Sequence, residues 1–506
     1  MPSTFRPSVR AGPVAAAILV AVLLAAGASA GLDATISGST SASTPPRANV
    51  LVGFTTPGVN ATLIAAAGGT LLKRGDSIGL ATVYTTNVSA FMLAMAGAPG
   101  VAFVEPNLAT HLDSSGWDSS GWDSSGWDSS GWDSSGWDSS GWDSSGWDSS
   151  GWDSSGWDSS GWDSSGWDSS GWDSSGWDSS GWDSSGWDSS GWDTAGNHSL
   201  FDGAWLTSAG APASKGVDPL LHRQWGLRAV NASPATLRQG AGSAICIVDS
   251  GVDSTHPDLA GKMWTAPDGT HGYDFVNMDT DPMDDAGHGT HVAGIAAAAT
   301  GNGAGIAGLS REKIMAVKVL AADGTGTEGN LALGIAWCAD HGAKVVSLSL
   351  GTDVDSKAVH RAVSYAFSHG AALVASVGNT GPCSGGCVRY PASYPEVMGV
   401  TALGTNGQPL RSDATGSLVS IAAPGWGIVS TWTGGSYRAL NGTSMAVPFV
   451  SATLAQVMDL NSTLAPAAAD NLVVHAAKDL GPAGRDPYVG YGVVDVGAAL
   501  AAAAAR

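Results

Sequence analysis

The sequence predicts an α/β fold for residues 218–506, with a mostly parallel sheet covered by helices on both faces. Two observations support this prediction. Five apolar runs of strand length recur in this part of the chain, and alanine-rich segments of helix length separate them. Parallel strands need long crossover connections, and helices in those connections cover both faces of the sheet. About 290 residues are enough for one large domain.

The strand-like runs carry few polar residues, as expected for strands buried on both faces. They are Ala244–Val248, Ile314–Val319, Val345–Leu350, Ala372–Val377 and Val397–Ala402. The helical segments are His288–Thr300, Gly329–His341 and Ser356–His369, and each lies between two of these runs. We therefore expect each helix to cross from one strand to the next.

The N-terminal 30 residues have the pattern of a signal peptide. Arg6 and Arg10 precede an apolar run, Val14–Ala26, and Ala28-Ser29-Ala30 provides a cleavage site of small residues. The alternative is a membrane anchor, but a spanning helix needs about 20 apolar residues and this run is shorter. We therefore expect a secreted protein.

Residues 49–112 predict a small α+β unit. Strand-like and helix-like runs alternate there in the order β-α-β-α-β. The strands are Asn49–Phe54, Gly79–Tyr84 and Val101–Val104, and the helices are Asn60–Ala67 and Ser89–Gly97. The segment has little apolar content, so we expect marginal stability if it stands alone. The alternative is a small independent domain.

Residues 113–192 repeat the pentapeptide Asp-Ser-Ser-Gly-Trp sixteen times. A period of five matches neither the helical period of 3.6 nor the strand period of 2, so no continuous apolar face can form. The simpler interpretation is a flexible acidic linker. The alternative uses the sixteen tryptophans as weak multivalent contacts to a carbohydrate, a cell envelope or a partner protein.

The charge of the chain argues against a nucleic-acid partner. The formal net charge is −22, and sixteen of the aspartates lie in the repeats, so the rest of the chain carries about −6. Binding to phosphates needs clustered Lys and Arg residues, and the sequence contains no such cluster.

Four cysteines follow the repeats, and export would permit disulfide bonds between them. Cys383 and Cys387 flank three small residues, a loop that a disulfide could close. Cys246 and Cys338 lie in apolar surroundings, where we expect them as buried small hydrophobic side chains.

Three motifs in the α/β part carry residues for nucleophilic catalysis. Asp249 ends a strand-like run, where a carboxylate would face the crevice at the carboxyl end of the sheet. His288 and Ser444 each lie where a loop leads into a helix. A serine nucleophile needs an imidazole to take its proton and a carboxylate to orient that imidazole. Each residue alone could be only a cap, and His288 with His291 could suggest a metal pair.

Together these motifs resemble those of the subtilisin-like peptidases, the subtilases. Asp249-Ser250-Gly251, His288-Gly289-Thr290-His291 and Gly442-Thr443-Ser444-Met445-Ala446 occur in the chain order of that family. The resemblance covers about residues 218–496 and includes Gly490-Tyr491-Gly492 near its end. It implies a serine endopeptidase with Ser444 as nucleophile, His288 as general base and then acid, and Asp249 as the orienting carboxylate.

The same resemblance implies further site residues. Asn379, in Val377-Gly378-Asn379-Thr380, matches the asparagine of the family's oxyanion hole. Two segments match the edges between which the family holds an extended peptide substrate, and they contain Gly324, Gly326, Ser349, Leu350 and Gly351. Ala375-Ser376-Val377 gives a small neutral pocket edge. Glu328 stands where the family often has an apolar or aromatic residue.

Calcium as a structural ion is also implied by the resemblance. Asp258 and Asn302 match side-chain ligands of a calcium site that is common in the family, and Asp218 matches a third. Backbone carbonyls of Thr300, Ala304 and Ile306 would complete the site. Ligation by oxygen alone suits Ca²⁺, whereas the alternative is that these residues only cap loops.

Residues 49–112, ending in Val104-Glu105-Pro106-Asn107, resemble the inhibitor-like propeptide of the family. The resemblance therefore implies a zymogen whose partners are peptide substrates and its own propeptide. The rival hypothesis is an inactive protein with a protease fold that binds surfaces through its repeats. The three motifs and Asn379 argue against that rival.

Overall fold

The computed structural model describes residues 48–112, 217–238, 242–383 and 386–506, which belong to one compact unit. The expected signal peptide and the pentapeptide repeats lie outside the described residues. Among the described residues, no helix is both long and apolar enough to cross a membrane.

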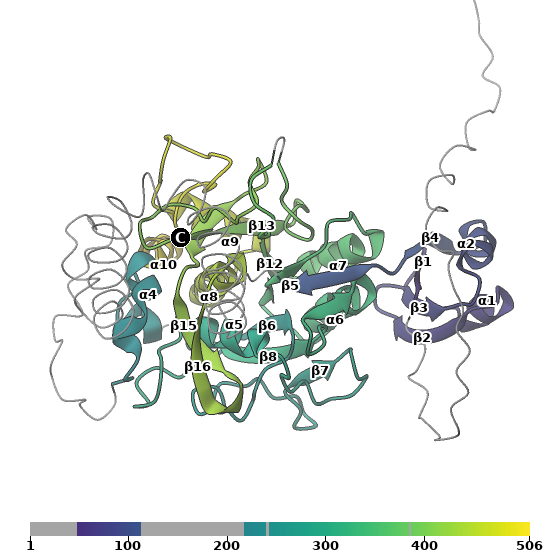
Figure 1. The fold of residues 1–506 in the computed structure, drawn as a ribbon, viewed down its shortest axis with the longest axis horizontal. Helices are drawn as coiled ribbons and strands as arrows, with labels where there is room; N and C mark the ends of the chain where they lie inside the picture. The colour runs from purple at the N-terminus through teal and green to yellow at the C-terminus, as the bar shows by residue number, and fades with distance from the viewer. Residues whose placement is uncertain (1–47, 113–216, 239–241, 384–385) are drawn as a thin grey trace, which may run out of the picture. The chain divides into compact units, whose positions relative to one another are not determined.

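A seven-stranded sheet forms the centre of the α/β domain (residues 217–506), and its neighbouring strands are all parallel (Figure 1). In the order in which they lie side by side, the strands are β14 (Ile421–Pro424), β13 (Val397–Leu403), β12 (Ala372–Ser376), β10 (Val345–Leu348), β6 (Ala244–Asp249), β8 (Lys313–Lys318) and β7 (Gly272–Asp274). Strand β6 has β8 as its neighbour on one side and β10 on the other, so the chain adds strands on both sides of β6. The carboxyl ends of β6 and β10 therefore mark a topological switch point, where open α/β sheets bind their ligands.

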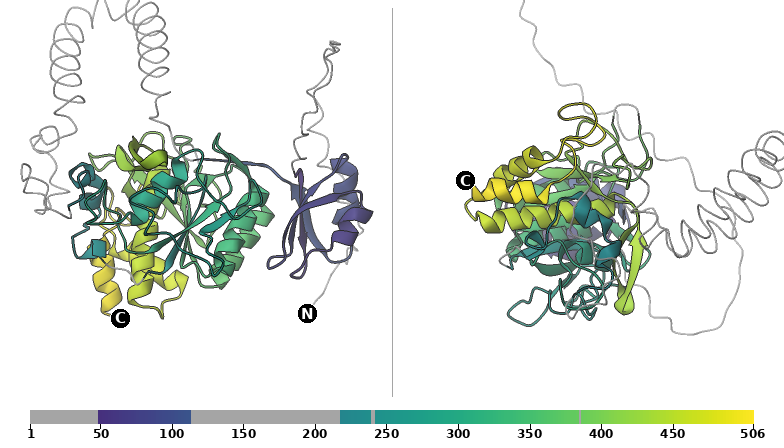
Figure 2. Two further views of the ribbon diagram at one scale, coloured as in Figure 1. Left: turned by 90° about the horizontal axis from the view of Figure 1, so that it is seen from below. Right: turned by 90° about the vertical axis from the view of Figure 1, so that its left-hand side faces the viewer.

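Helices cover both faces of this sheet, as the sequence predicts (Figure 2). Successive residues of β6 point to opposite faces. Ile245 and Ile247 join one core cluster, whereas Cys246 and Val248 join the other. The first cluster contains residues of α5 (His288–Ala297), α8 (Thr443–Leu460), α9 (Pro466–Ala476) and α10 (Val496–Ala504), and the second contains residues of α6 (Glu328–Asp340) and α7 (Lys357–Ser368).

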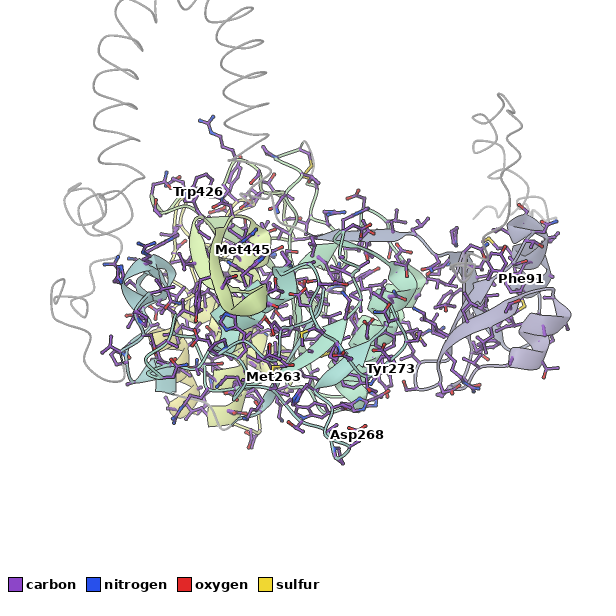
Figure 3. All side chains as sticks on the ribbon, turned by 60° about the horizontal axis from the view of Figure 1, so that its bottom comes forward. Phe91, Met263, Asp268, Tyr273, Trp426 and Met445 are labelled. Atoms are coloured by element: carbon purple, nitrogen blue, oxygen red, sulfur yellow. A yellow bond between two sulfur atoms is a disulfide. The ribbon has the colours of Figure 1, made fainter. Side chains whose placement is uncertain are left out.

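The N-terminal unit (residues 48–112) is an α+β unit with one strand more than the sequence predicts. Its sheet has the order β2-β3-β1-β4, and its core is a cluster around Phe91 (Figure 3). The elements are β1 (Val50–Phe54), α1 (Ala61–Ala66), β2 (Thr70–Gly75), β3 (Leu80–Tyr84), α2 (Val88–Ala96) and β4 (Val101–Pro106). The prediction missed β2, a half-buried edge strand with Lys73 and Arg74, because its apolar residues are too few to show a strand pattern.

A small sheet joins the N-terminal unit to the α/β domain. Strand β5 (Ala109–Leu112) lies between β11 (Leu350–Gly351) and β9 (Thr325–Thr327), antiparallel to both. The single strand predicted at Val345–Leu350 is therefore divided between the parallel sheet and this small one. A separate hairpin, β15 (Ile428–Trp432) with β16 (Ser436–Leu440), packs on α5.

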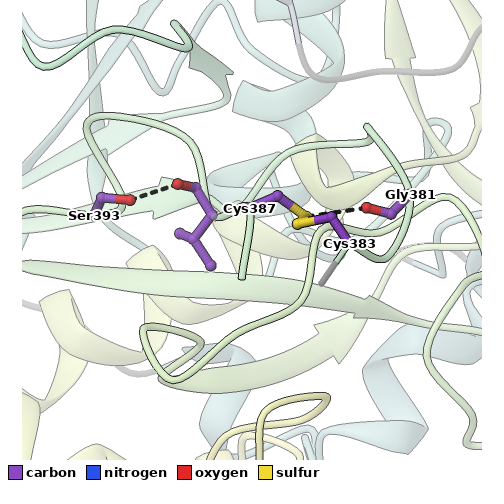
Figure 4. The surroundings of a disulfide bond; sticks show 5 residues. Gly381, Cys383, Cys387 and Ser393 are labelled. Carbon is purple, nitrogen blue, oxygen red and sulfur yellow. Dashed lines mark hydrogen bonds between the residues drawn. A yellow bond between two sulfur atoms is a disulfide. The ribbon is translucent and has the colours of Figure 1, made fainter. Parts of the chain in front are cut away.

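The cysteines form two disulfide bonds. Cys383–Cys387 closes the small loop that the sequence predicts (Figure 4). The expectation for the other two cysteines was wrong in part. Cys246 and Cys338 are fully buried, as expected, but they bond to each other and link β6 to α6. The sequence could not show this pairing, because the two residues are 92 positions apart and only the packing of α6 on β6 brings them together.

Candidate active site

Asp249 and His288 meet at the carboxyl end of β6. Asp249 is the last residue of the strand, and His288 is the first residue of α5. His288 Nδ1 and Asp249 Oδ1 are 2.8 Å apart, and both side chains are almost fully buried. Because water cannot compete for this carboxylate, the contact fixes the orientation of the imidazole ring.

Two glycines allow α5 to approach the strand so closely. Gly287, the residue before the helix, has a φ of 97°, a backbone conformation that side chains other than glycine rarely adopt. A Cβ at Gly289 would lie 2.1 Å from the carbonyl oxygen of Gly251. Residues with side chains at these two positions would push His288 away from Asp249.

Asp284 is a positioning residue that the sequence motifs did not single out. Its carboxylate accepts hydrogen bonds from Ser250 Oγ (2.9 Å), from Thr290 Oγ1 (2.6 Å) and from backbone amides that include that of Gly287 (2.8 Å). Ser250 Oγ in turn accepts a hydrogen bond from the amide of Gly289 (2.9 Å). Asp284 thus joins the loop after β6 to the first turn of α5. The position of Asp284, four residues before His288, could have indicated this role in the sequence. Several other acidic residues lie in the same loop, however, and the sequence does not distinguish among them.

Ser444 lies in the first turn of α8, beside the carboxyl end of β10. It is fully buried, and the adjacent Met445 packs into the core (Figure 3). Two hydrogen bonds connect Ser444 to Ser349: Ser444 Oγ donates to the Ser349 carbonyl (3.1 Å), and Ser349 Oγ donates to the Ser444 carbonyl (2.9 Å). The switch point of the sheet therefore places the serine and the Asp249–His288 pair on the same edge.

Asn379 follows β12 and contacts the residue before Ser444. Its Oδ1 accepts hydrogen bonds from the backbone amide and from the hydroxyl of Thr443, each at 3.1 Å. These two bonds fix the plane of the amide and turn Nδ2 away from Thr443. The amide group and the N-terminus of α8, whose amides carry partial positive charge, lie together.

The chain's own strand β5 lies between β9 and β11, in the place where the resemblance puts an extended peptide substrate, which we call the groove. Leu112 lies opposite Leu350, and its amide donates to the Gly324 carbonyl (3.3 Å). On the other side Thr110 lies opposite Gly326. All five residues that the sequence assigns to substrate binding therefore border this strand or adjoin it. Residue Ser349, which contacts Ser444, directly precedes the position paired with Leu112.

The residues expected to bind calcium gather around the loop after α5. Asp218 accepts hydrogen bonds from the amides of Gly301 (2.7 Å) and Asn302 (3.1 Å). Asp258 accepts one from Asn302 Nδ2 (2.7 Å) and one from the amide of Ile306 (3.0 Å). The two carboxylates are buried, and no basic side chain of the described ranges pairs with either.

This loop fits a cation by charge and by ligand type. Burial raises the pKa of Asp218, and the nearby negative charge of Asp258 raises it further. A divalent cation between the two carboxylates would remove that cost. The remaining expected ligands, the carbonyls of Thr300, Ala304 and Ile306, lie in the same loop. Oxygen ligands of this kind match the preference of Ca²⁺.

His291 has a structural position. Its Nε2 contacts the carbonyls of Ile428 (2.9 Å) and Arg438 (3.1 Å) in the β15–β16 hairpin. Complete burial lowers its pKa to about 3, so the ring is neutral. The two histidines therefore have different partners, His291 the hairpin carbonyls and His288 the Asp249 carboxylate.

Comparison with known proteins places this chain in a family. Residues 240–492 match the Subtilase family model. Thermitase from Thermoactinomyces vulgaris is 44% identical over 231 residues, which are 45% of this chain and 80% of thermitase. Subtilisin BL from Lederbergia lenta is 37% identical over 260 residues, 51% of this chain and 92% of that protein. The solved structure of Sphericase aligns with a TM-score of 0.49 and 30% identity, covering 54% of this chain and 97% of Sphericase. On the family match and these identities, the chain belongs to the subtilase family and is a serine endopeptidase.

Proposed function

We propose that Asp249, His288 and Ser444 form the catalytic triad of this endopeptidase. The observation that carries the proposal is the buried contact between His288 Nδ1 and Asp249 Oδ1, because it holds the ring by Nδ1 and assigns proton transfer to Nε2, at the edge that holds Ser444. Ser444 Oγ would attack the carbonyl carbon of the scissile bond and pass its proton to His288. His288 would then protonate the leaving amine, and a water molecule would hydrolyse the acyl-enzyme.

Asn379 and the Ser444 amide would stabilise the tetrahedral intermediate. The orientation of the Asn379 amide supports this role, since its oxygen is engaged by Thr443 and its nitrogen faces the other way. Two donors aimed at the developing oxyanion act in the transition state and cost no reorganisation there.

The protein would be made as a secreted zymogen that its own N-terminal unit inhibits. Strand β5 supports this proposal, because it fills the groove between β9 and β11 as an extended peptide substrate would. The path of β5 leads past Leu112 toward Ser349 and Ser444, so maturation would cut the chain shortly after Leu112. The expected signal peptide of residues 1–30 would direct export.

The repeats would then stay on the mature enzyme as its N-terminal extension. Their simpler role is that of a tether, and contact with a cell envelope or carbohydrate is the alternative. N-terminal sequencing of the mature protein tests the cut. A mature N-terminus shortly after residue 112 is expected, whereas one beyond residue 192 would contradict the proposed position.

A casein gel tests the catalytic assignment. Purified wild-type protein should clear casein, and the Ser444→Ala variant should not, since the nucleophile is gone. Ser451→Ala is a matched control, because this buried serine of α8 hydrogen-bonds to Ser347 and lies about two helical turns from Ser444. Clearing by Ser444→Ala, or none by a folded wild type, would refute the proposal.

A further inference from the structure

Two carboxyl groups meet where the N-terminal unit contacts the α/β domain. Glu105, in β4, lies at the first turn of α7 and accepts hydrogen bonds from Ser356 Oγ (2.9 Å) and from the amide of Ala358 (2.8 Å). The amide of Lys357 also donates to it (3.1 Å). Glu328, the first residue of α6, also forms a side-chain hydrogen bond with Ser356. The Ser356 hydroxyl thus contacts one carboxyl group from each part, Glu105 of the N-terminal unit and Glu328 of the α/β domain.

Glu328 contacts the segment that leads into β5. Its amide donates to the Leu108 carbonyl (2.9 Å), just before β5, and its Oε1 accepts a hydrogen bond from Thr352 Oγ1 (3.3 Å), just after β11. The side chain therefore extends from one edge of the groove toward the other, and it is 1% exposed. Among the described residues, no basic side chain forms an ion pair with it.

The bound N-terminal unit makes the ionised form of Glu328 costly. Burial and, after it, the negative charge of Glu105 raise the pKa of Glu328 to about 7. Three hydrogen-bond donors point at the Glu105 carboxyl group, and in the closed state Glu328 takes up a proton as the pH falls below about 7. Release of the unit removes both Glu105 and the chain that covers Glu328.

We propose that Glu105 and Glu328 form a pH-sensitive latch, which holds the N-terminal unit in acidic medium and weakens as the pH rises to neutrality. The proposal rests on the zymogen function proposed above. It adds the pH range in which the inhibiting N-terminal unit dissociates from the α/β domain. An ionisable residue at position 328 is what makes the latch possible, because an apolar side chain there could not titrate.

The sign and the range of the effect follow from proton linkage. Glu328 has a pKa of about 7 in the closed state and returns toward its ordinary 4.5 when uncovered. Closure is therefore strongest below pH 4.5, weakens between pH 4.5 and 7, and stays constant above pH 7. Each unit of pKa difference is a factor of ten, so the closing equilibrium changes by up to about 300-fold.

Two basic groups near the pair keep their charge over this pH range. Lys73, which joins β2 to Asn330 of α6, has a pKa lowered by burial to about 8 and so remains charged over the range. Arg361 of α7 stays charged and acts on Glu105. The remaining ionisable groups around the contact are Lys357 on α7, Asp353 and Asp355 before it, Tyr394 against Ser356, and His111 on the exposed side of β5.

Hydrogen exchange in the full-length Ser444→Ala chain tests the latch. This variant cannot cut itself, so the N-terminal unit stays attached. Protection of the amides in residues 105–112, corrected for the intrinsic rate at each pH, should fall about 80-fold between pH 4.5 and 7 and approach about 300-fold only over a range that extends well beyond both values. Protection of β6 in the same sample serves as the internal reference.

Adding Glu328→Gln should keep the protection of residues 105–112 high at every pH, since an amide does not ionise. Adding Glu105→Gln should reduce the dependence only in part, because it removes the repelling charge while burial, the larger cause of the raised pKa of Glu328, remains. Glu396→Gln is the matched control: Glu396 contacts Ser364 and His360, away from the N-terminal unit, and should leave the dependence intact. His111→Asn should leave it intact as well.

An equal pH dependence with and without Glu328→Gln, or none in the parent chain, would overturn the latch. These outcomes are distinct from failure of the proposed function. The exchange experiment uses a chain without its nucleophile, whereas the function is judged by casein clearing and by the position of the mature N-terminus.

Discussion

Two buried aspartates beside His288 differ in what they hold. Asp249 faces the imidazole, and Asp284 faces hydroxyl and amide donors of the surrounding loop. A carboxylate surrounded by neutral donors organises backbone, whereas one opposite an imidazole stabilises the charge that develops on it. In the sequence both are aspartates shortly before a glycine, Asp249 before Gly251 and Asp284 before Gly287. Only the partners found in the structure separate their roles.

Replacing Asn379 by Leu should reduce kcat with little change in KM, because the lost donor would act on the oxyanion and not on the bound substrate. The expected loss is about 10²–10³-fold, the size known for the oxyanion-hole asparagine of subtilisin, a member of the same family. Steady-state kinetics on a peptide substrate provides the measurement. A parallel rise in KM would instead indicate a role in binding.

At the scale of elements, the site depends on where strands end and helices begin. β6 and β10 end at the switch point, and α5 and α8 begin there. Apolar strand runs and alanine-rich helices were readable along the sequence because their patterns are local. The prediction missed β2, β5, β7, β9, β14 and the β15–β16 hairpin, since each is short and is stabilised by its neighbours more than by its own composition.

The disulfide between Cys246 and Cys338 should stabilise the link between β6 and α6. Replacing both cysteines by Ala in the Ser444→Ala chain should lower the free energy of unfolding by about 2–4 kcal/mol, because the bond closes a loop of 92 residues. Urea denaturation measures the change. Replacing Cys383 and Cys387, which close a loop of only 4, should cost less, and the reverse order would contradict the argument from loop length.

At the scale of the whole molecule, the N-terminal unit and the α/β domain share one small sheet. Strand β5 occupies the groove. Glu105 accepts a hydrogen bond from the first turn of α7, and Asn107 accepts one from the first turn of α6. These contacts join residues more than 200 positions apart along the chain. The pentapeptide repeats lie between β5 and its two partner strands in the sequence. β5 therefore pairs with strands that do not follow it directly along the chain.

Removing calcium should destabilise the molecule. A cation held between Asp218 and Asp258 would bind the folded state alone, so at 100 times its dissociation constant it would add about 3 kcal/mol to the free energy of unfolding. Thermal unfolding of the Ser444→Ala chain with CaCl₂ and with EDTA should give a clearly lower Tm in EDTA. Asp258→Asn should shrink that difference, and an equal Tm in both media would contradict the expected calcium site.

Local patterns along the chain were enough for the α/β class, the order of the three motifs and the family they imply, because strand and helix periods and short motifs are properties of neighbouring residues. Only the packed fold reveals the Cys246–Cys338 bond, the role of Asp284, the occupation of the groove by β5 and the meeting of Glu105 with Glu328. Each of these joins residues that are distant in sequence or takes its meaning from burial. Proximity and loss of water arise only when the sheet and helices pack, so no local pattern records them.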